Sequence, residues 1–405
     1  MTDPMTRERS ALITATAFVV ALSLRPALTA VGPVLPRIGQ DLQLGEAAQG
    51  LLGTLPLLAF AVASPLVHLA SRRFGMERAV FVSLLVLAAS SALRPYTGQA
   101  GLWIGTAVVG AAIAVGNVLV PVIIKRDYSA HVSRATGVYT AFITGGAAVA
   151  SILAVPIADA VDWRLSLAVW GGLAVLVAIV WLPRTLAPEP MPAPRTEDET
   201  PPVSVWRQPM AWLVTGFMGL QSTSFYLVVN WLPTIEITTG GVSERSTGVH
   251  LFVFQVFGLI GGLSIPFLLK HPTNQRAGLM TASTPILIAL LGLLLAPHLA
   301  IVWAVIGGLG QGAGLVAALS LISIRGRGHH ETTQLSGMAQ AVGYALAASG
   351  PVLAGYLTQA TGGWTVTLIV FATLAALQVT VGFVGGVDRR TPSTHQKPAP
   401  SGAAA

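Results

Sequence analysis

Long apolar runs recur along the whole chain, separated by short polar or proline- and glycine-rich breaks. A helix of about 20 apolar residues crosses the ~30 Å hydrocarbon core of a bilayer. The pattern therefore predicts twelve transmembrane helices. In the first half they cover residues 11–36, 48–69, 79–96, 101–124, 134–158 and 164–183, and in the second half residues 209–232, 246–269, 277–296, 300–324, 333–357 and 364–385.

One long polar interruption divides these helices into two sets of six. Residues 184–208 are rich in proline and acidic residues, which predicts a flexible cytoplasmic linker between an N-terminal bundle (1–183) and a C-terminal bundle (209–387). The proline- and alanine-rich segment 388–405 is predicted to be a disordered cytoplasmic tail.

Two short motifs repeat between the halves. Leu35-Pro36-x-Ile38 near the end of the first span matches Leu232-Pro233-x-Ile235 near the end of the seventh. Chance similarity of apolar segments is the alternative, but the shared proline favours a true repeat. We therefore predict an all-α membrane protein with two pseudo-symmetric six-helix bundles, related by an axis along the membrane normal.

Composition and charge support this interpretation and orient the chain. Only 10% of the residues are charged and 53% are hydrophobic, whereas soluble domains carry about 25% charged residues. Most of the 23 lysines and arginines fall in the termini, the linker and the loops of one side, while the opposite loops hold only Arg37, Arg94, Arg164 and Arg245. The positive-inside rule then predicts a bacterial cytoplasmic membrane protein with both termini in the cytoplasm.

Other classes of protein fit the sequence poorly. The net charge of +7 is spread singly between apolar runs, so a nucleic-acid-binding face is not expected. The absence of cysteine excludes a disulfide scaffold and a cysteine-ligated metal site. Arg7 and Arg9 precede an apolar stretch as in a signal peptide, but that stretch continues past Arg25 and reads as a retained first span. No metal, cofactor or catalytic residue set is predicted.

Arg25 is the most informative residue. It lies about fourteen residues into the first span, about 21 Å along a helix and past the bilayer centre. A charge there costs about 2.5–3.5 kcal/mol, so such residues usually face a pathway inside the protein. No acidic residue falls deep in a predicted span, and an unpaired arginine fork favours an anionic or nitro-like ligand. The alternative is that Arg25 binds backbone carbonyls freed by Pro26 or reaches out to the membrane surface.

Several neutral polar residues fall at a similar depth. Buried amides and phenols in a membrane need partners, so they are expected to point inward, either as contacts between helices or as the wall of a cavity. The candidate substrate-binding residues beside Arg25 are Gln221, Tyr226, Gln255, Gln311, Tyr344 and, closer to the cytoplasm, Asn117. His250 is a possible proton-coupling residue, since proton relays use Asp, Glu or His; an ordinary interfacial histidine is the alternative.

Three sequence motifs resemble the major facilitator superfamily and, within it, the cyanate-permease and 2-nitroimidazole-exporter family. They are Leu24-Arg25-Pro26-Ala27-x-Thr29, Pro121-x-Ile123-Ile124-Lys125-Arg126-Asp127 and Trp231-Leu232-Pro233-Thr234. The resemblance implies a secondary transporter that works by alternating access. It also implies inner-loop gating by Arg72, Arg73, Gly75 and Asp127, although Arg72 replaces the usual acid of that loop.

These observations lead to one main hypothesis and one alternative. The main hypothesis is a monomeric secondary transporter, not an enzyme, that moves a small anionic or weakly acidic solute and binds it at Arg25. A proton is a candidate second partner. The alternative is a multidrug or nitroimidazole-type exporter with a permissive apolar cavity, in which Arg25 matters less.

Overall fold

The structure is a computed structural model that describes residues 4–128, 131–186, 204–269, 274–326 and 328–387. The first half forms α1 (Pro4–Ser23), α2 (Pro26–Thr29), α3 (Val31–Asp41), α4 (Glu46–Phe74), α5 (Met76–Leu93), α6 (Gly98–Asp127), α7 (Val132–Ala160) and α8 (Trp163–Thr185). The second half forms α9 (Pro209–Gly240), α10 (Glu244–Leu268), α11 (Arg276–Leu295), α12 (Ala300–Arg325), α13 (Gly328–Thr361) and α14 (Trp364–Gly385), with short 3₁₀ turns η2 (Val205–Arg207) and η3 (Pro297–Leu299).

The described residues contain twelve helical spans that are long and apolar enough to cross a membrane, which confirms the predicted fold class. Within this part of the chain, α1, α2 and α3 together form the first span, Thr14–Asp41, which is broken beside Arg25. Most of the predicted linker and the whole tail (187–203 and 388–405) lie outside the described residues.

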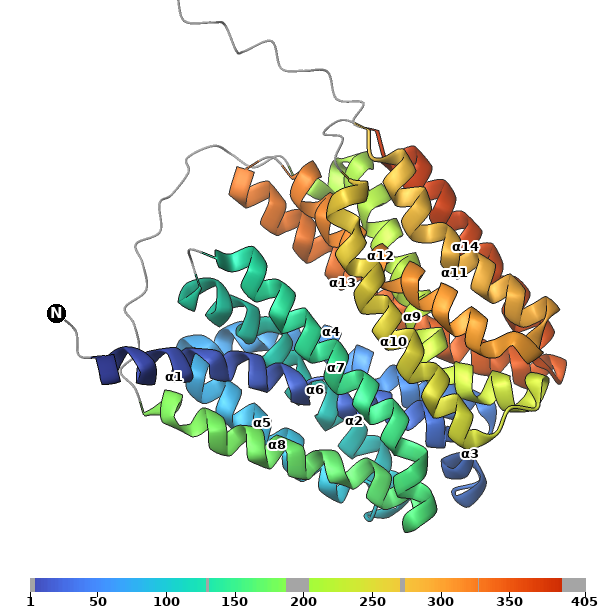
Figure 1. The fold of residues 1–405 in the computed structure, drawn as a ribbon, viewed down its shortest axis with the longest axis horizontal. Coiled ribbons are helices and arrows are strands. Elements are labelled where there is room, and N and C mark those ends of the chain that lie inside the picture. Colours follow the sequence, from blue (N-terminus) through green and yellow to red (C-terminus); the bar gives the residue numbers. More distant parts are fainter. Residues whose placement is uncertain (1–3, 129–130, 187–203, 270–273, 327, 388–405) are drawn as a thin grey trace, which may run out of the picture.

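The two halves lie side by side, and they are close at one end and spread apart at the other (Figure 1). We call the end that carries Arg37, Asp159 and Glu244 the outer end, following the predicted orientation, and the end that carries Glu77 and Asp127 the inner end. Between the halves, α4 packs against α13 and α7 packs against α10.

Glycines make the contact between the halves very close at the outer end. A Cβ added at Gly32 would lie 2.2 Å from the Val229 carbonyl oxygen, and one at Gly50 would lie 2.2 Å from that of Pro351. A Cβ at Gly248 would lie 2.8 Å from the Ser151 carbonyl oxygen. Such small residues allow helix backbones to approach closely, so these contacts hold the outer end shut.

Candidate functional site

The break in the first span places Arg25 in the interior. α1 ends at Ser23, and Pro26 begins α2 without a backbone N–H to continue the helix. The Arg25 carbonyl accepts hydrogen bonds from the N–H groups of Leu28 (2.9 Å) and Thr29 (3.1 Å). The chain therefore resumes as a new helix directly after Arg25. The Arg25 side chain extends from the break between α1 and α2.

The Arg25 guanidinium points across the molecule to the second bundle. Its Nη1 donates to the Tyr226 hydroxyl (3.3 Å), and its Cζ lies 5.8 Å from the centre of the Phe225 ring. Tyr139 and Tyr344 are near enough to interact with it electrostatically, and its Nε is buried without a hydrogen-bond partner. Within the described residues, no carboxylate lies within ion-pair distance of Arg25.

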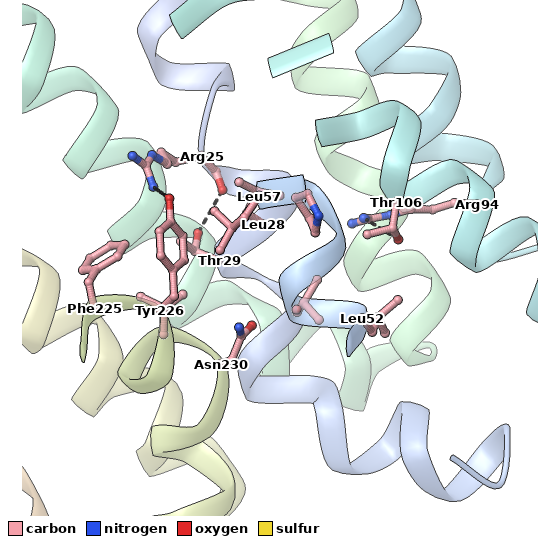
Figure 2. Close-up of a pocket in the computed structure, with 14 residues that line it drawn as sticks. Arg25, Leu28, Thr29, Leu52, Leu57, Arg94, Thr106, Phe225, Tyr226 and Asn230 are labelled. Carbon is pink, nitrogen blue, oxygen red and sulfur yellow. Dashed lines mark hydrogen bonds between the residues drawn. The ribbon is translucent and has the colours of Figure 1, made fainter. Parts of the chain in front are cut away.

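Arg25 lines a small cavity that reaches from α2 and α3 to α4, α6 and α9. Figure 2 shows Arg25 and Tyr226 pointing toward one another beside Phe225, with Arg94 and Thr106 some distance away. The lining residues are Arg25, Leu28, Thr29, Val31, Leu52, Gly53, Pro56, Leu57, Arg94, Thr106, Phe225, Tyr226, Val229 and Asn230. Most of the lining is apolar. Its two charged side chains, Arg25 and Arg94, are both arginines.

Arg94 lies in the turn between α5 and α6, as the sequence predicted, but its side chain turns inward. Its side chain is buried (1% exposed) at the C-terminal end of α5. It donates to the Ala27 carbonyl (2.7 Å) and to the Thr106 hydroxyl (3.3 Å). Arg94 therefore binds a carbonyl of the broken first span, the role considered as an alternative for Arg25. Hydropathy could not predict the burial of Arg94, because the sequence around an arginine at a span end is the same whether its side chain points into the protein or out of it.

The other predicted substrate residues divide into two groups. Tyr226 lines the cavity and Tyr344 lies near Arg25. The side-chain amides of Gln221 and Gln311 instead bind each other (3.0 Å) between α9 and α12. Buried Gln255 and half-buried Asn117 do not line this cavity. Asn230 and Phe225 of α9 also line it.

His250 has a partner that the sequence analysis did not predict. Its Nδ1 lies 3.0 Å from Oε2 of Glu236, a side chain with no exposed surface. Glu236 lies near the end of its span, as the sequence predicted, but its side chain is enclosed by the protein. The predicted seventh span ended at residue 232, whereas α9 continues to Gly240 and encloses Glu236 in the protein.

Four charged residues join the halves at the outer end, and we call them the outer ion-pair cluster. Arg37 binds both carboxylate oxygens of Glu244 through Nε (3.1 and 2.9 Å). It also reaches Asp159 (2.6 Å), which binds Arg245 (3.2 Å). Since Arg37 and Asp159 belong to the first bundle and Glu244 and Arg245 to the second, the cluster ties the bundles together.

The charged residues at the inner end form a second set, the inner ion-pair cluster. Arg126 binds Glu77 (2.6 Å) and Asp127 (2.9 Å), and Arg184 also binds Asp127. All four belong to the first bundle.

Of the other predicted gating residues, Gly75 joins α4 to α5 with φ 85°, and Arg73 is exposed over the Phe74 ring. Arg72 lies in α4; its side chain lies outside the described part.

Comparison with known proteins identifies the kind of molecule that carries this site. The Major Facilitator Superfamily profile matches residues 17–349. The chain is 38% identical to the 2-nitroimidazole transporter of Escherichia coli K12, over 92% of this chain and 94% of that protein. It is 27% identical to the cyanate transport protein CynX of the same organism, over 85% and 90%. A bacterial homologue of the human lysosomal transporter Spinster, solved in an inward-facing and occupied conformation, has the same fold (TM-score 0.76, 16% identity, covering 95% of this chain and 97% of that one).

Proposed function

The chain belongs to the major facilitator superfamily, and we propose that it transports a small anionic or weakly acidic solute that binds at Arg25. It is a multi-pass membrane transporter rather than an enzyme. The observation that carries the proposed substrate class is the Arg25 guanidinium, which faces a cavity without a carboxylate partner among the described residues. An arginine fork presents paired donors to the oxygens of a carboxylate or nitro group.

The surroundings of Arg25 favour a small, planar solute. Phe225 offers a ring face and Tyr226 a hydroxyl, and the guanidinium already lies against both. Leu52, Leu57 and Val229 line the same cavity with apolar surface. A compact conjugated anion, or an acid that loses its proton on binding, satisfies the guanidinium and fills the apolar space together. The names of the two relatives, which refer to a nitroimidazole and to cyanate, agree with this size and chemistry.

We further propose an inner-membrane monomer with both termini in the cytoplasm, working by alternating access. In this conformation the outer ion-pair cluster and the glycine contacts close the outer end, so solute would exchange with the cytoplasm. Transport then requires these contacts to break while the inner ends of the bundles meet.

A direct binding experiment tests the role of Arg25. Thermal unfolding of the purified protein is followed with cyanate, nitrite, 4-hydroxybenzoate or 2-nitroimidazole, and the affinity of any ligand that stabilises the protein is then measured. Arg25→Gln should weaken that affinity about ten- to hundredfold, the effect of losing a charged hydrogen bond. Arg25→Lys keeps the charge but not the fork and should recover only part of the loss.

Arg164→Gln is the matched control, since this arginine pairs with the exposed Asp41 outside the cavity. Unchanged affinity in Arg25→Gln for an identified ligand contradicts the anion-anchor proposal. It would instead support the second candidate, a permissive exporter of nitroimidazole-like compounds, which the largely apolar lining of the cavity also favours.

A further inference from the structure

Glu236 and His250 form a buried pair in the outer half of the second bundle, where α9 and α10 meet. The carboxylate Oε2 and the imidazole Nδ1 are 3.0 Å apart. The Glu236 side chain is fully buried and that of His250 is 14% exposed. Neither residue lines the Arg25 cavity, so the pair is a separate feature of the transporter.

The contacts of Glu236 leave its charge poorly compensated. Oε1 is buried and has no hydrogen-bond partner, so His250 is the group that balances the carboxylate. An isolated ionised carboxylate inside a protein is strongly unfavourable. One proton makes the pair neutral overall, whether it resides on the imidazole beside a carboxylate or on a carboxylic acid beside a neutral imidazole.

No other ionisable group of the packed helices takes over this role in the described part of the chain. Arg37, Asp159, Glu244 and Arg245 bind one another in the outer ion-pair cluster. Asp41 in α3 binds Arg164. The ion pair of Glu236 in the described residues is with His250. The other charged or titratable side chains of the elements packed against α9 or α10 include Glu46 and Arg73 in α4, Arg134 and Tyr139 in α7, Arg207 in η2, Arg276 in α11, His298 in η3, Arg325 in α12, and Glu331, Tyr344 and Tyr356 in α13.

The position of the pair connects it with the opening of the outer end. His250 lies on α10 less than two turns after Glu244, which Arg37 binds from the first bundle. Between them, Gly248 packs on the Ser151 carbonyl of α7. If the bundles separate at the outer end, the segment of α10 from Glu244 to His250 loses its contacts with the first bundle and becomes accessible to water. Glu236 in turn lies ten residues after Tyr226 on α9, about 15 Å from the partner of Arg25.

We propose that Glu236 and His250 form a proton-binding site of this transporter, which exchanges its proton with the outer solution when α10 separates from α3 and α7. The inference rests on the proposed secondary transport, to which it adds the proton as a partner with its own site. The bound proton removes the net charge of the pair, and its release leaves a buried carboxylate without a cation. Proton and solute therefore occupy different places, and both contact helix α9.

Charge movement without any solute tests the site directly. The purified protein is reconstituted in liposomes on a solid-supported membrane and exposed to a step from neutral to acidic pH. Wild type should give a transient current, because protons bind to a site within the membrane. Glu236→Gln should reduce this current to that of protein-free liposomes, and His250→Gln should shift the pH at which half of the charge moves. Asp41→Asn, which changes an exposed outer carboxylate, should behave as wild type.

Correct folding of each variant is verified by its elution as a single species and its thermal unfolding. If Glu236→Gln does not fold, Glu236→Asp and the double variant Glu236→Gln/His250→Gln replace it, and the double variant must give no current. A wild-type current in folded Glu236→Gln or in the folded double variant, or no current in wild type, overturns the proposal. Because none of the candidate solutes is added, either result leaves the Arg25 experiment unaffected. A failure of the Arg25 experiment likewise leaves this current unchanged.

Discussion

The outer and inner ends of the molecule use the same kinds of residues in opposite ways. At the outer end, arginines of one bundle bind carboxylates of the other, and glycines bring the two backbones into contact. At the inner end, Glu77, Arg126, Asp127 and Arg184 bind one another within the first bundle. The outer pairs therefore depend on the conformation of the transporter, whereas the inner pairs stabilise one bundle whatever its position. This difference supports the proposal of an inward-facing state.

A single reporter can measure this difference. The chain contains no cysteine, so Leu28→Cys places one thiol in the wall of the Arg25 cavity. A membrane-impermeant maleimide added to the outside of cells reacts with it only when the outer end opens.

The largest effect is expected from Gly50→Val. A side chain there meets the Pro351 backbone at 2.2 Å, and backbone cannot move aside as a flexible side chain can. Such overpacking costs about 1–3 kcal/mol or more, which should keep the outer end open and increase labelling of Leu28→Cys from outside. Gly172→Val is the control, because nothing lies within 4 Å of its added Cβ, and its labelling should equal that of the parent protein. Equal labelling in both variants would contradict the close contact.

Glu244→Gln should have the next largest effect. It removes the two-pronged contact with Arg37 that crosses between the bundles. The pair is partly exposed, so a loss on the order of 1 kcal/mol is expected, about a fivefold rise in the open population. Outside labelling measures this rise. An unchanged rate would show that the glycine contacts alone close the outer end.

Asp127→Asn should lower the thermal stability of the protein without opening its outer end. The carboxylate binds Arg126 and Arg184, both within the first bundle, and its loss leaves the buried Arg184 with one acidic partner fewer. A lower unfolding temperature with parental outside labelling is the expected result. Increased outside labelling would mean that Asp127 acts on the equilibrium between conformations.

Arg245→Gln should have the smallest effect. This arginine is 70% exposed and contacts Asp159 at 3.2 Å, and exposed pairs contribute about 0–1 kcal/mol. Labelling and unfolding temperature should both stay close to those of the parent. A change as large as that of Glu244→Gln would show that the outer ion-pair cluster works as one unit.

Hydropathy predicted the twelve spans because each must present about 20 apolar residues to lipid, a constraint visible in single segments. The position of Arg25 within the first span was predictable for the same reason. The contacts between polar residues could not be predicted, because they depend on how each helix is rotated and packed. Gln221 and Gln311 share the expected depth yet bind each other, and Arg94 and Glu236, both near span ends, turn inward.

Labelling of Leu28→Cys from each side of the membrane, in an otherwise unchanged protein, tests the inward-facing assignment most directly. The maleimide is added separately to right-side-out and to inverted membrane vesicles. We predict rapid labelling in inverted vesicles, slowed by an anion that binds Arg25, and little labelling in right-side-out vesicles. Faster labelling in right-side-out vesicles would contradict a closed outer end and the function of the outer ion-pair cluster.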